Sequence, residues 1–327
     1  MKKYLFLAAM IMIGAANLNA ASPKKGKVTP EQKGVQSINL ATAEAHINFL
    51  ACDELEGREA GWKGGRIAGN YIISCLKQMG LQPLFEDGYV QPFEACHAER
   101  QKRGQRWQVH PDSIANLKQG VHQSLDLRNI LCKIEGTNPN EIVIIGAHYD
   151  HLGNLGRKVY YAGAHDNASG TAAIVTLAAH YAKQRPKYDM YFIAFSGEDA
   201  FLRGSEWYAK NPLVSLKQIK YLFNLDMIAD NNPEQYCEFS DEAMEGFALF
   251  EKINTEKGYF KALDRHDLDE NSDHWPFAKK NVPVVFFMNE HGDAYKYYHT
   301  IHDTYENHIF SNYEPTFNLI ENFINKY

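Results

Sequence analysis

The chain lacks the patterns of several common protein classes. Its five cysteines (Cys52, Cys75, Cys96, Cys132 and Cys237) include no Cys-x-x-Cys pair, which argues against a thiolate zinc site. Lysine and arginine form no basic stripe and the formal net charge is −6, so no nucleic-acid partner is expected. The His-Glu-x-x-His helix, the Walker loop, the glycine-rich dinucleotide fingerprint and the Gly-x-Ser-x-Gly elbow are also missing. Any catalytic chemistry must therefore come from another arrangement of residues.

The amino terminus has the pattern of an export leader. Lys2 and Lys3 precede an apolar stretch at residues 5–13, and Gly14-Ala15-Ala16 or Leu18-Asn19-Ala20 offers a cleavage site. The apolar stretch is too short to span a bilayer, although a short membrane anchor is the alternative. We expect residues 1–20 to be a signal peptide and residues 21–36 a flexible tether. The mature protein would then be periplasmic or secreted, without stable membrane insertion.

Strands and helices alternate along the rest of the chain. Apolar runs predict strands at residues 141–145, 191–195, 221–225 and 282–288, and residues 130–134 alternate like an edge strand. Helical periodicity appears at residues 41–50, 67–79, 171–181, 207–209 and 244–257, and in a terminal helix with Pro315 in its first turn. This order predicts an α/β fold whose mostly parallel sheet has helices on both faces. We expect one monomeric domain over residues 37–327, with a surface insertion near residues 97–122 that holds a hairpin or a lid.

Potential metal ligands follow these strands. The carboxyl ends of parallel strands meet at one edge of a sheet, where the functional crevice of an open α/β sheet lies. Three candidates come just after predicted strands, a fourth lies in the loop that follows the strand at 282–288, and one opens the helix at 171–181. Together they are His148, Asp166, Asp199, Asp226 and His299. We therefore expect these five side chains to form a single site.

The five residues fit two zinc ions. Zinc takes nitrogen and oxygen ligands, and two ions about 3.5–4 Å apart can hold both sides of a reacting carbonyl. His148 and Asp226 would bind one ion, Asp199 and His299 the other, and Asp166 would bridge them.

Two further acids are candidate catalytic residues. Glu198, beside Asp199 at a turn, is placed to act as a general base. Asp150 follows His148 at strand spacing and would hydrogen-bond its imidazole. Taken singly, each residue of the site has an ordinary explanation: a lone histidine facing solvent, a capping aspartate, or a solvated acidic turn. Their joint placement in an alternating sheet favours the functional interpretation.

These motifs resemble those of the zinc-dependent exopeptidases, a family that includes secreted bacterial leucyl-type aminopeptidases and, as a divergent branch, glutaminyl cyclases. The resemblance covers nearly the whole mature chain, in the order Leu55-Glu56-Gly57-Arg58, Met79-Gly80-Leu81-Gln82-Pro83, Gly146-Ala147-His148-Tyr149-Asp150, residues 163–170, Phe195-Ser196-Gly197-Glu198-Asp199, Gly204-Ser205, Asn224-Leu225-Asp226-Met227, Tyr298-His299-Thr300 and Asp303-Thr304. It implies a three-layer α/β/α domain of the phosphorylase/hydrolase-like type, two zinc ions, Glu198 as base and the ligand assignment above. It also implies a cis peptide bond after Asp166.

The resemblance leaves three functions open. An aminopeptidase, acting on peptides with a free amino terminus, is favoured by residues 167–170 and by the short spacing from Asp199 to Gly204-Ser205. A glutaminyl cyclase with one zinc is favoured by Asp273-His274-Trp275-Pro276-Phe277, where Trp275 either stacks on a small planar substrate or, as is more common for an aromatic residue beside proline, packs within the protein. A non-catalytic relative would not need Glu198. Two positions depart from the family pattern, because His165 stands where relatives commonly have Asp and Asp199 replaces the more frequent Glu.

Overall fold

The computed structural model describes residues 40–86, 88–98, 107–289 and 295–327. The expected signal peptide and tether lie outside the described residues. Within the described ranges, no helix combines the length and the apolar character needed to cross a bilayer.

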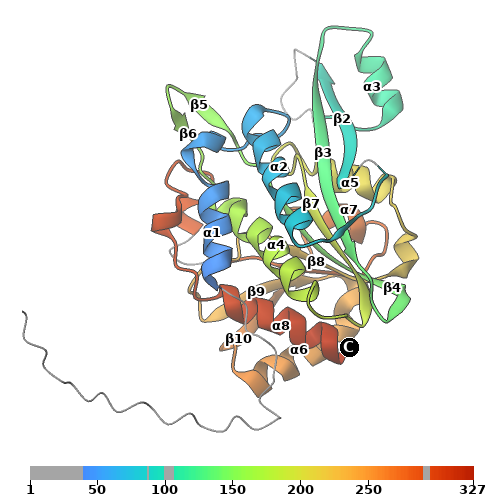
Figure 1. The fold of residues 1–327 in the computed structure, drawn as a ribbon, viewed down its shortest axis with the longest axis vertical. Coiled ribbons are helices and arrows are strands. Elements are labelled where there is room, and N and C mark those ends of the chain that lie inside the picture. The colour runs from blue at the N-terminus through green and yellow to red at the C-terminus, as the bar shows by residue number, and fades with distance from the viewer. Residues whose placement is uncertain (1–39, 87, 99–106, 290–294) are drawn as a thin grey trace, which may run out of the picture. The chain divides into compact units, whose positions relative to one another are not determined.

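Nine strands of the described chain form one mixed sheet, in the order β1-β3-β7-β4-β8-β11-β9-β10 with β2 beside β3 (Figure 1). Their bounds are β1 (Gln82–Pro83), β2 (Val90–Ala98), β3 (His122–Ile134), β4 (Asn138–His148), β7 (Tyr188–Phe195), β8 (Ile219–Leu225), β9 (Glu234–Phe239), β10 (Ala262–His266) and β11 (Val284–Phe287). The central strands β7, β4, β8 and β11 are parallel, whereas β3 and β9 run antiparallel to their neighbours β7 and β11. A separate small hairpin contains β5 (Asn154–Gly156) and β6 (Val159–Tyr160).

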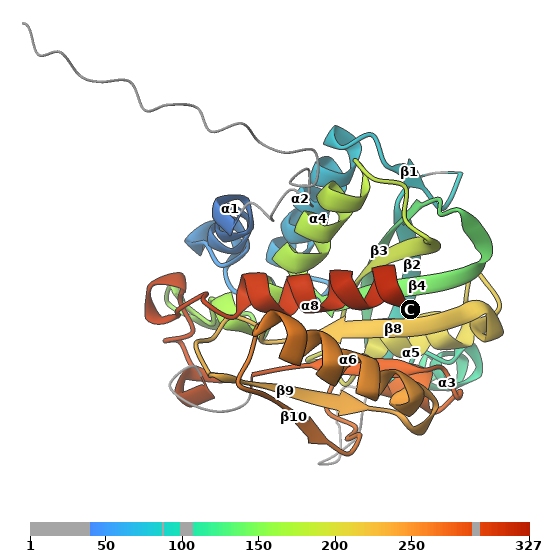
Figure 2. The ribbon, with the colours of Figure 1, turned by 90° about the horizontal axis from the view of Figure 1, so that it is seen from below.

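Helices cover both faces of this sheet, which confirms the α/β fold with a parallel centre. The helices are α1 (Leu40–Leu50), α2 (Lys63–Gln78), α3 (Pro111–Leu117), α4 (Gly170–Tyr181), α5 (Arg203–Lys210), α6 (Met244–Lys257), α7 (Trp275–Ala278) and α8 (Tyr313–Lys326). Successive residues of β4 point to opposite faces: Val143 and Ile145 join the core beneath α1, α2, α4, α6 and α8, and Ile142 and Ile144 join the core beneath α5 and α7. Figure 2 shows α4 and α8 on the same side of the strands.

One expectation about the early strands needs correction. Residues 130–134 do not form an edge strand, because β3 continues back to His122 and lies between β7 and the pair β1 and β2. The segment near 97–122 lies between β2, which ends at Ala98, and β3, which begins at His122, and it contains α3. The resulting β2–β3 hairpin projects beyond the main sheet (Figure 1).

Candidate metal centre

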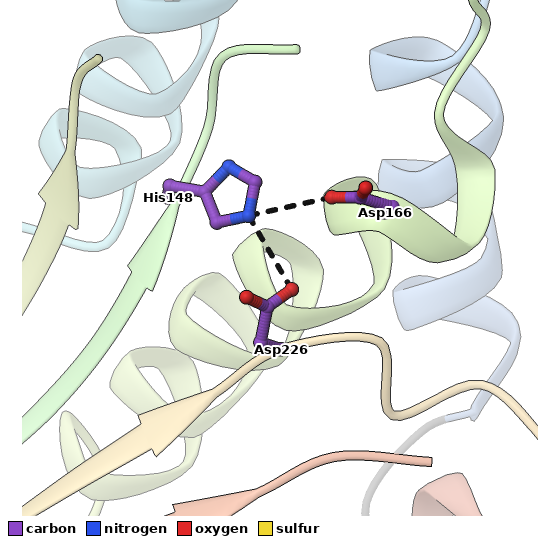
Figure 3. A group of neighbouring side chains, drawn as sticks. All are labelled: His148, Asp166 and Asp226. Atoms are coloured by element: carbon purple, nitrogen blue, oxygen red, sulfur yellow. Dashed lines mark hydrogen bonds and ion pairs between the residues drawn. The ribbon is translucent and has the colours of Figure 1, made fainter. Parts of the chain in front are cut away.

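One half of the centre joins residues from three chain segments. His148 is the last residue of β4, Asp226 follows β8, and Asp166 lies in the turn that leads into α4. The His148 Nε2 atom lies 3.3 Å from Asp226 Oδ1 and 3.4 Å from Asp166 Oδ1. Figure 3 shows both carboxylates facing this same ring nitrogen. All three side chains are buried, so they present converging nitrogen and oxygen atoms to one point.

The other half of the centre uses the second oxygen of Asp166. The His299 Nε2 atom lies 3.2 Å from Asp166 Oδ2 and 3.6 Å from Asp199 Oδ1. Asp199 follows β7, and His299 comes from the loop after β11, where the Tyr298 ring stacks on it at a centroid distance of 3.7 Å. The structure thus brings all five predicted ligands together, with Asp166 between the two histidines.

His151 is a site residue that the sequence interpretation missed. Its buried Nδ1 atom lies 3.2 Å from Asp199 Oδ2 and 3.8 Å from Asp166 Oδ1. The Asp199 carboxylate therefore has one oxygen toward His299 and the other toward His151. The only feature of the sequence that could have indicated His151 is its position beside Asp150, in the loop after β4. An orienting bond of this kind limits the freedom of the short Asp199 side chain.

The two predicted catalytic acids lie at the centre in different ways. Glu198 is partly buried, and one of its oxygens falls within 4.8 Å of ligand atoms of both His148 and Asp199. Asp150 is fully buried, but its main-chain oxygen, at 3.3 Å, is the atom that accepts from His148 Nδ1. Burial raises the pKa of the Asp150 carboxyl to about 6. Asp150 thus orients the imidazole through its backbone rather than through the predicted carboxylate bond.

The charges of the centre fit a metal cation. In the described residues, the ion pairs of Asp166, Asp199 and Asp226 are all with histidine. Burial opposes ionisation of Asp166, yet the neighbouring histidines hold its pKa well below the usual range. Burial together with Asp199 and Asp226 raises the pKa of Glu198 well above its usual value. Buried carboxylates at this density need a compensating cation, and the nitrogen and oxygen donors are those that zinc accepts.

The main chain around Asp166 is held by Arg58 and Asp303. The Arg58 side chain is fully buried and donates to the carbonyl oxygens of Gly163 (2.6 Å) and Asp166 (3.1 Å). The Asp303 carboxylate accepts from the amides of His165 (2.8 Å) and Asp166 (3.0 Å). The Asp166–Asn167 peptide bond is cis, as the resemblance implied. Residues distant in the sequence therefore fix the position of the shared carboxylate.

Asp226 is oriented from the side opposite His148. The Ser272 hydroxyl donates to Asp226 Oδ2 at 2.7 Å and itself accepts from Asn224 Nδ2 at 2.9 Å. This leaves Asp226 Oδ1 directed at His148. Ser272 was not among the predicted residues, since a serine in a loop carries no chemical signal of its own.

His165 does not face the ligands. Its ring is buried and stacks on that of His308 at a centroid distance of 5.0 Å. Burial lowers the pKa of His165 to about 4. The ring therefore adds no positive charge beside Asp166 at neutral pH.

Two hollows adjoin the centre. A cavity of about 210 Å³ lies directly over it and is lined by His148, Asp166, Glu198, Asp226, Met227, Asn271, Met288, Tyr295, Tyr298 and His299. A larger cleft of about 520 Å³ reaches Asp150, His151 and Asp199 from the side of the β2–β3 hairpin. Trp275 lines a separate depression with Phe239 and Lys279, and the Lys279 ammonium lies over its ring at 5.6 Å.

The sequence matches the model of Peptidase family M28 over residues 129–323. An aminopeptidase of Pseudomonas aeruginosa (strain UCBPP-PA14) is 27% identical over 191 residues, which are 55% of this chain and 34% of that protein. Aminopeptidase YwaD of Bacillus subtilis (strain 168) is 29% identical over 309 residues, 90% of this chain and 66% of that protein. The chain thus spans about a third of the length of the first relative and about two thirds of the second.

Solved structures share the fold at low sequence identity. An aminopeptidase from Aneurinibacillus sp. strain AM-1 superposes with a TM-score of 0.69 at 18% identity, covering 88% of this chain and 93% of its own. A glutaminyl cyclase of Bacteroides thetaiotaomicron superposes with a TM-score of 0.66 at 18% identity, covering 89% and 98%. Because both activities occur on this fold, the choice between them rests on the site.

Proposed function

This chain belongs to peptidase family M28, and we propose that it is a zinc-dependent aminopeptidase that removes the first residue from peptides with a free amino terminus. The proposal includes two zinc ions held by the five ligands and Glu198 as general base. On the leader pattern of residues 1–20, we also propose that the enzyme is exported to the periplasm or the medium.

The observation that supports this function best is that the two oxygens of the Asp166 carboxylate face different histidines. Its Oδ1 atom lies 3.4 Å from His148 Nε2 and its Oδ2 atom 3.2 Å from His299 Nε2. A carboxylate with one oxygen toward each ligand set is suited to bridge two ions, whereas a one-ion site would leave His299 and Asp199 without a role. Zinc ions bound there would supply Lewis acidity, which polarises a carbonyl group and lowers the pKa of water.

The protein groups supply proton transfer and orientation. Glu198 lines the smaller cavity beside the ligands, where its carboxylate can take a proton from the attacking water and return it to the leaving amine. The acids of the same centre can also accept hydrogen bonds from the free α-amino group of the substrate. Ser272 and Asp303 keep Asp226 and the Asp166 main chain fixed while the substrate reacts.

The cavity over the centre suits an apolar or neutral first residue. Met227, Met288, Tyr295 and Tyr298 contribute apolar and aromatic surface to its wall. Its volume of about 210 Å³ accommodates one side chain rather than several. An acidic first side chain would lose hydration there and would face the carboxylates of Asp166, Glu198 and Asp226, which line the same cavity.

The cyclase alternative loses the feature that favoured it in the sequence. Trp275 belongs to the depression with Phe239 and Lys279 and does not line the cavity over His148. A substrate bound in the cavity over the metal ligands would therefore not stack on the Trp275 ring. Both ligand sets are also complete, which a single-zinc enzyme would not require.

We expect the purified protein to hydrolyse leucine p-nitroanilide, to lose this activity on chelation and to regain it when zinc is added. The Nα-acetylated substrate should not be hydrolysed, because the free amine is needed at the acidic centre. Release of p-nitroaniline, followed spectroscopically with metal content measured on the same samples, tests both points. Equal hydrolysis of the acetylated compound, or full activity in metal-free protein, would contradict the proposal.

A further inference from the structure

Part of β3 has an open edge above the candidate metal centre. β3 pairs with β2 from His122 to Ile130, but it pairs with β7 only from Ile130 to Ile134. Within the described ranges, residues 122–129 of β3 therefore have a neighbouring strand on one side only. Open strand edges are templates for another extended chain.

The main-chain groups that face this edge follow from the alternation of an antiparallel strand. The Leu131 amide donates to Tyr89 O on the β2 side at 2.7 Å. The Arg128 carbonyl accepts from the Tyr149 hydroxyl on the other side at 2.9 Å. Even-numbered residues therefore direct their amides and carbonyls away from β2, so those of Ser124 and Asp126 face the open edge. Among the described residues, these groups have no hydrogen-bond partner.

The open edge begins near two acids of the candidate metal centre. β7 pairs with β3 up to the Ala194–Ile130 pair, and after Phe195 the chain turns away at Gly197, whose φ is 81°. Glu198 and Asp199 come directly after this turn. Among the described residues, no strand continues along β3 beyond this point in the direction of β7.

The large cleft occupies this place. Its walls include Ser124 and Leu125 on the β3 side and Ala60 and Trp62 on the other, and it reaches Asp199 at its base. Trp62 is 59% exposed, which leaves its ring available for contact. Asp199 lines the cleft, where its Oδ2 faces His151, and its Oδ1 faces His299, which lines the smaller cavity.

We propose that this cleft binds the peptide segment that follows the first residue of the substrate, as an added strand antiparallel to β3. The inference rests on the proposed aminopeptidase function. With its amino terminus at the metal centre, the substrate would run outward in the direction of β7 and pair with the main chain of Ser124 and Asp126. Trp62 would pack on alternate side chains. The favoured substrates are then extended peptides of several residues rather than single-residue amides.

Substrate length and main-chain methylation test this assignment. We expect kcat/KM for Leu-Ala-Ala-Ala to exceed that for leucinamide by about tenfold or more, since each main-chain hydrogen bond adds a modest but measurable free energy. N-methylation of the third and of the fourth residue, one at a time, should lower kcat/KM about tenfold at one position and little at the other, because successive amides of a strand face opposite sides. Equal effects at both positions would overturn the added strand.

A variant in the cleft supplies the second test. Trp62→Ala should lower the ratio of kcat/KM for the tetrapeptide to that for leucinamide severalfold. The control Leu155→Ala removes a side chain of similar exposure, 61%, in the β5–β6 hairpin and should leave the ratio unchanged. An unchanged ratio in Trp62→Ala would overturn the role of the cleft.

The experiments distinguish an error in the aminopeptidase assignment from an error in the cleft assignment. If neither leucinamide nor any peptide is hydrolysed, the aminopeptidase assignment fails, whatever binds in the cleft. Calorimetry with Glu198→Gln protein and the same N-methylated peptides then measures binding alone. Affinity that increases with length and alternates with the methylated position supports the cleft assignment, and affinity independent of both overturns it.

Discussion

Glu198→Gln is expected to keep the fold and the bound zinc and to lose turnover by about 10²–10⁴-fold, the usual contribution of a general base. Glutamine retains the shape of the side chain but cannot accept a proton, and Glu198 is not among the five predicted ligands. Steady-state kinetics with leucine p-nitroanilide, together with zinc content and a thermal melt, separates loss of chemistry from loss of structure.

A matched control is available at the opposite end of the sheet. Glu141 pairs with Lys220 at the surface, near the start of the regular pairing of β4, and Glu141→Gln should leave kcat unchanged. Near-normal turnover in Glu198→Gln would remove Glu198 from the mechanism. Loss of zinc from that variant would instead assign Glu198 as a ligand.

Asp166→Ala is expected to be the most damaging ligand substitution, because one carboxylate faces both ligand sets. Removing a group that only supports a metal ligand costs about 10–100-fold in metal affinity, so removal of the bridge should cost more. Elemental analysis after dialysis against zinc-free buffer should find the zinc content of Asp166→Ala far below that of Asp226→Ala, which removes a ligand from one set only.

Folding of the Asp166 variants can be checked independently. Arg58 and Asp303 hold the main chain of this turn rather than its side chain, so circular dichroism of Asp166→Ala should remain native. Asp166→Asn preserves the size of the side chain and provides a second variant with weakened metal binding. Retention of two equivalents of zinc by Asp166→Ala would eliminate the bridging assignment.

The parts of the fold that could be predicted are those whose apolar pattern is local. The apolar run predicted as a strand at residues 191–195 lies within β7 and is buried throughout, and α6 spans the predicted Met244–Lys257. β9 was missed because its sequence, Glu234–Phe239, contains buried polar residues. Gln235 accepts from Thr316 of α8, and Glu238 pairs with the buried His274. Only these distant partners make such residues acceptable in a core strand.

The metal centre likewise contains residues that a local sequence pattern predicts and residues that it does not. Four of its five predicted ligands and Glu198 come at strand ends or at a helix start, where the topology of a parallel sheet directs them to one edge. His299 comes from the loop that follows β11. Arg58, Asp303 and Ser272 support that centre through contacts with main-chain atoms or with one ligand oxygen. Contacts of this kind depend on loop geometry, which no local pattern encodes. Arg58 and Asp303 appeared in the sequence only as parts of shared motifs, without a role.

Product identity is the most direct test of the proposed activity. Incubation of the purified, zinc-loaded protein with Leu-Ala-Ala-Ala and with Gln-Ala-Ala-Ala, followed by mass spectrometry and an ammonia assay, distinguishes the two enzymes that this fold supports. An aminopeptidase releases free leucine or glutamine and a peptide shortened by one residue, which is the result we predict. Release of ammonia from the glutamine peptide, with an intact cyclised product and no cleavage of either peptide, would contradict it.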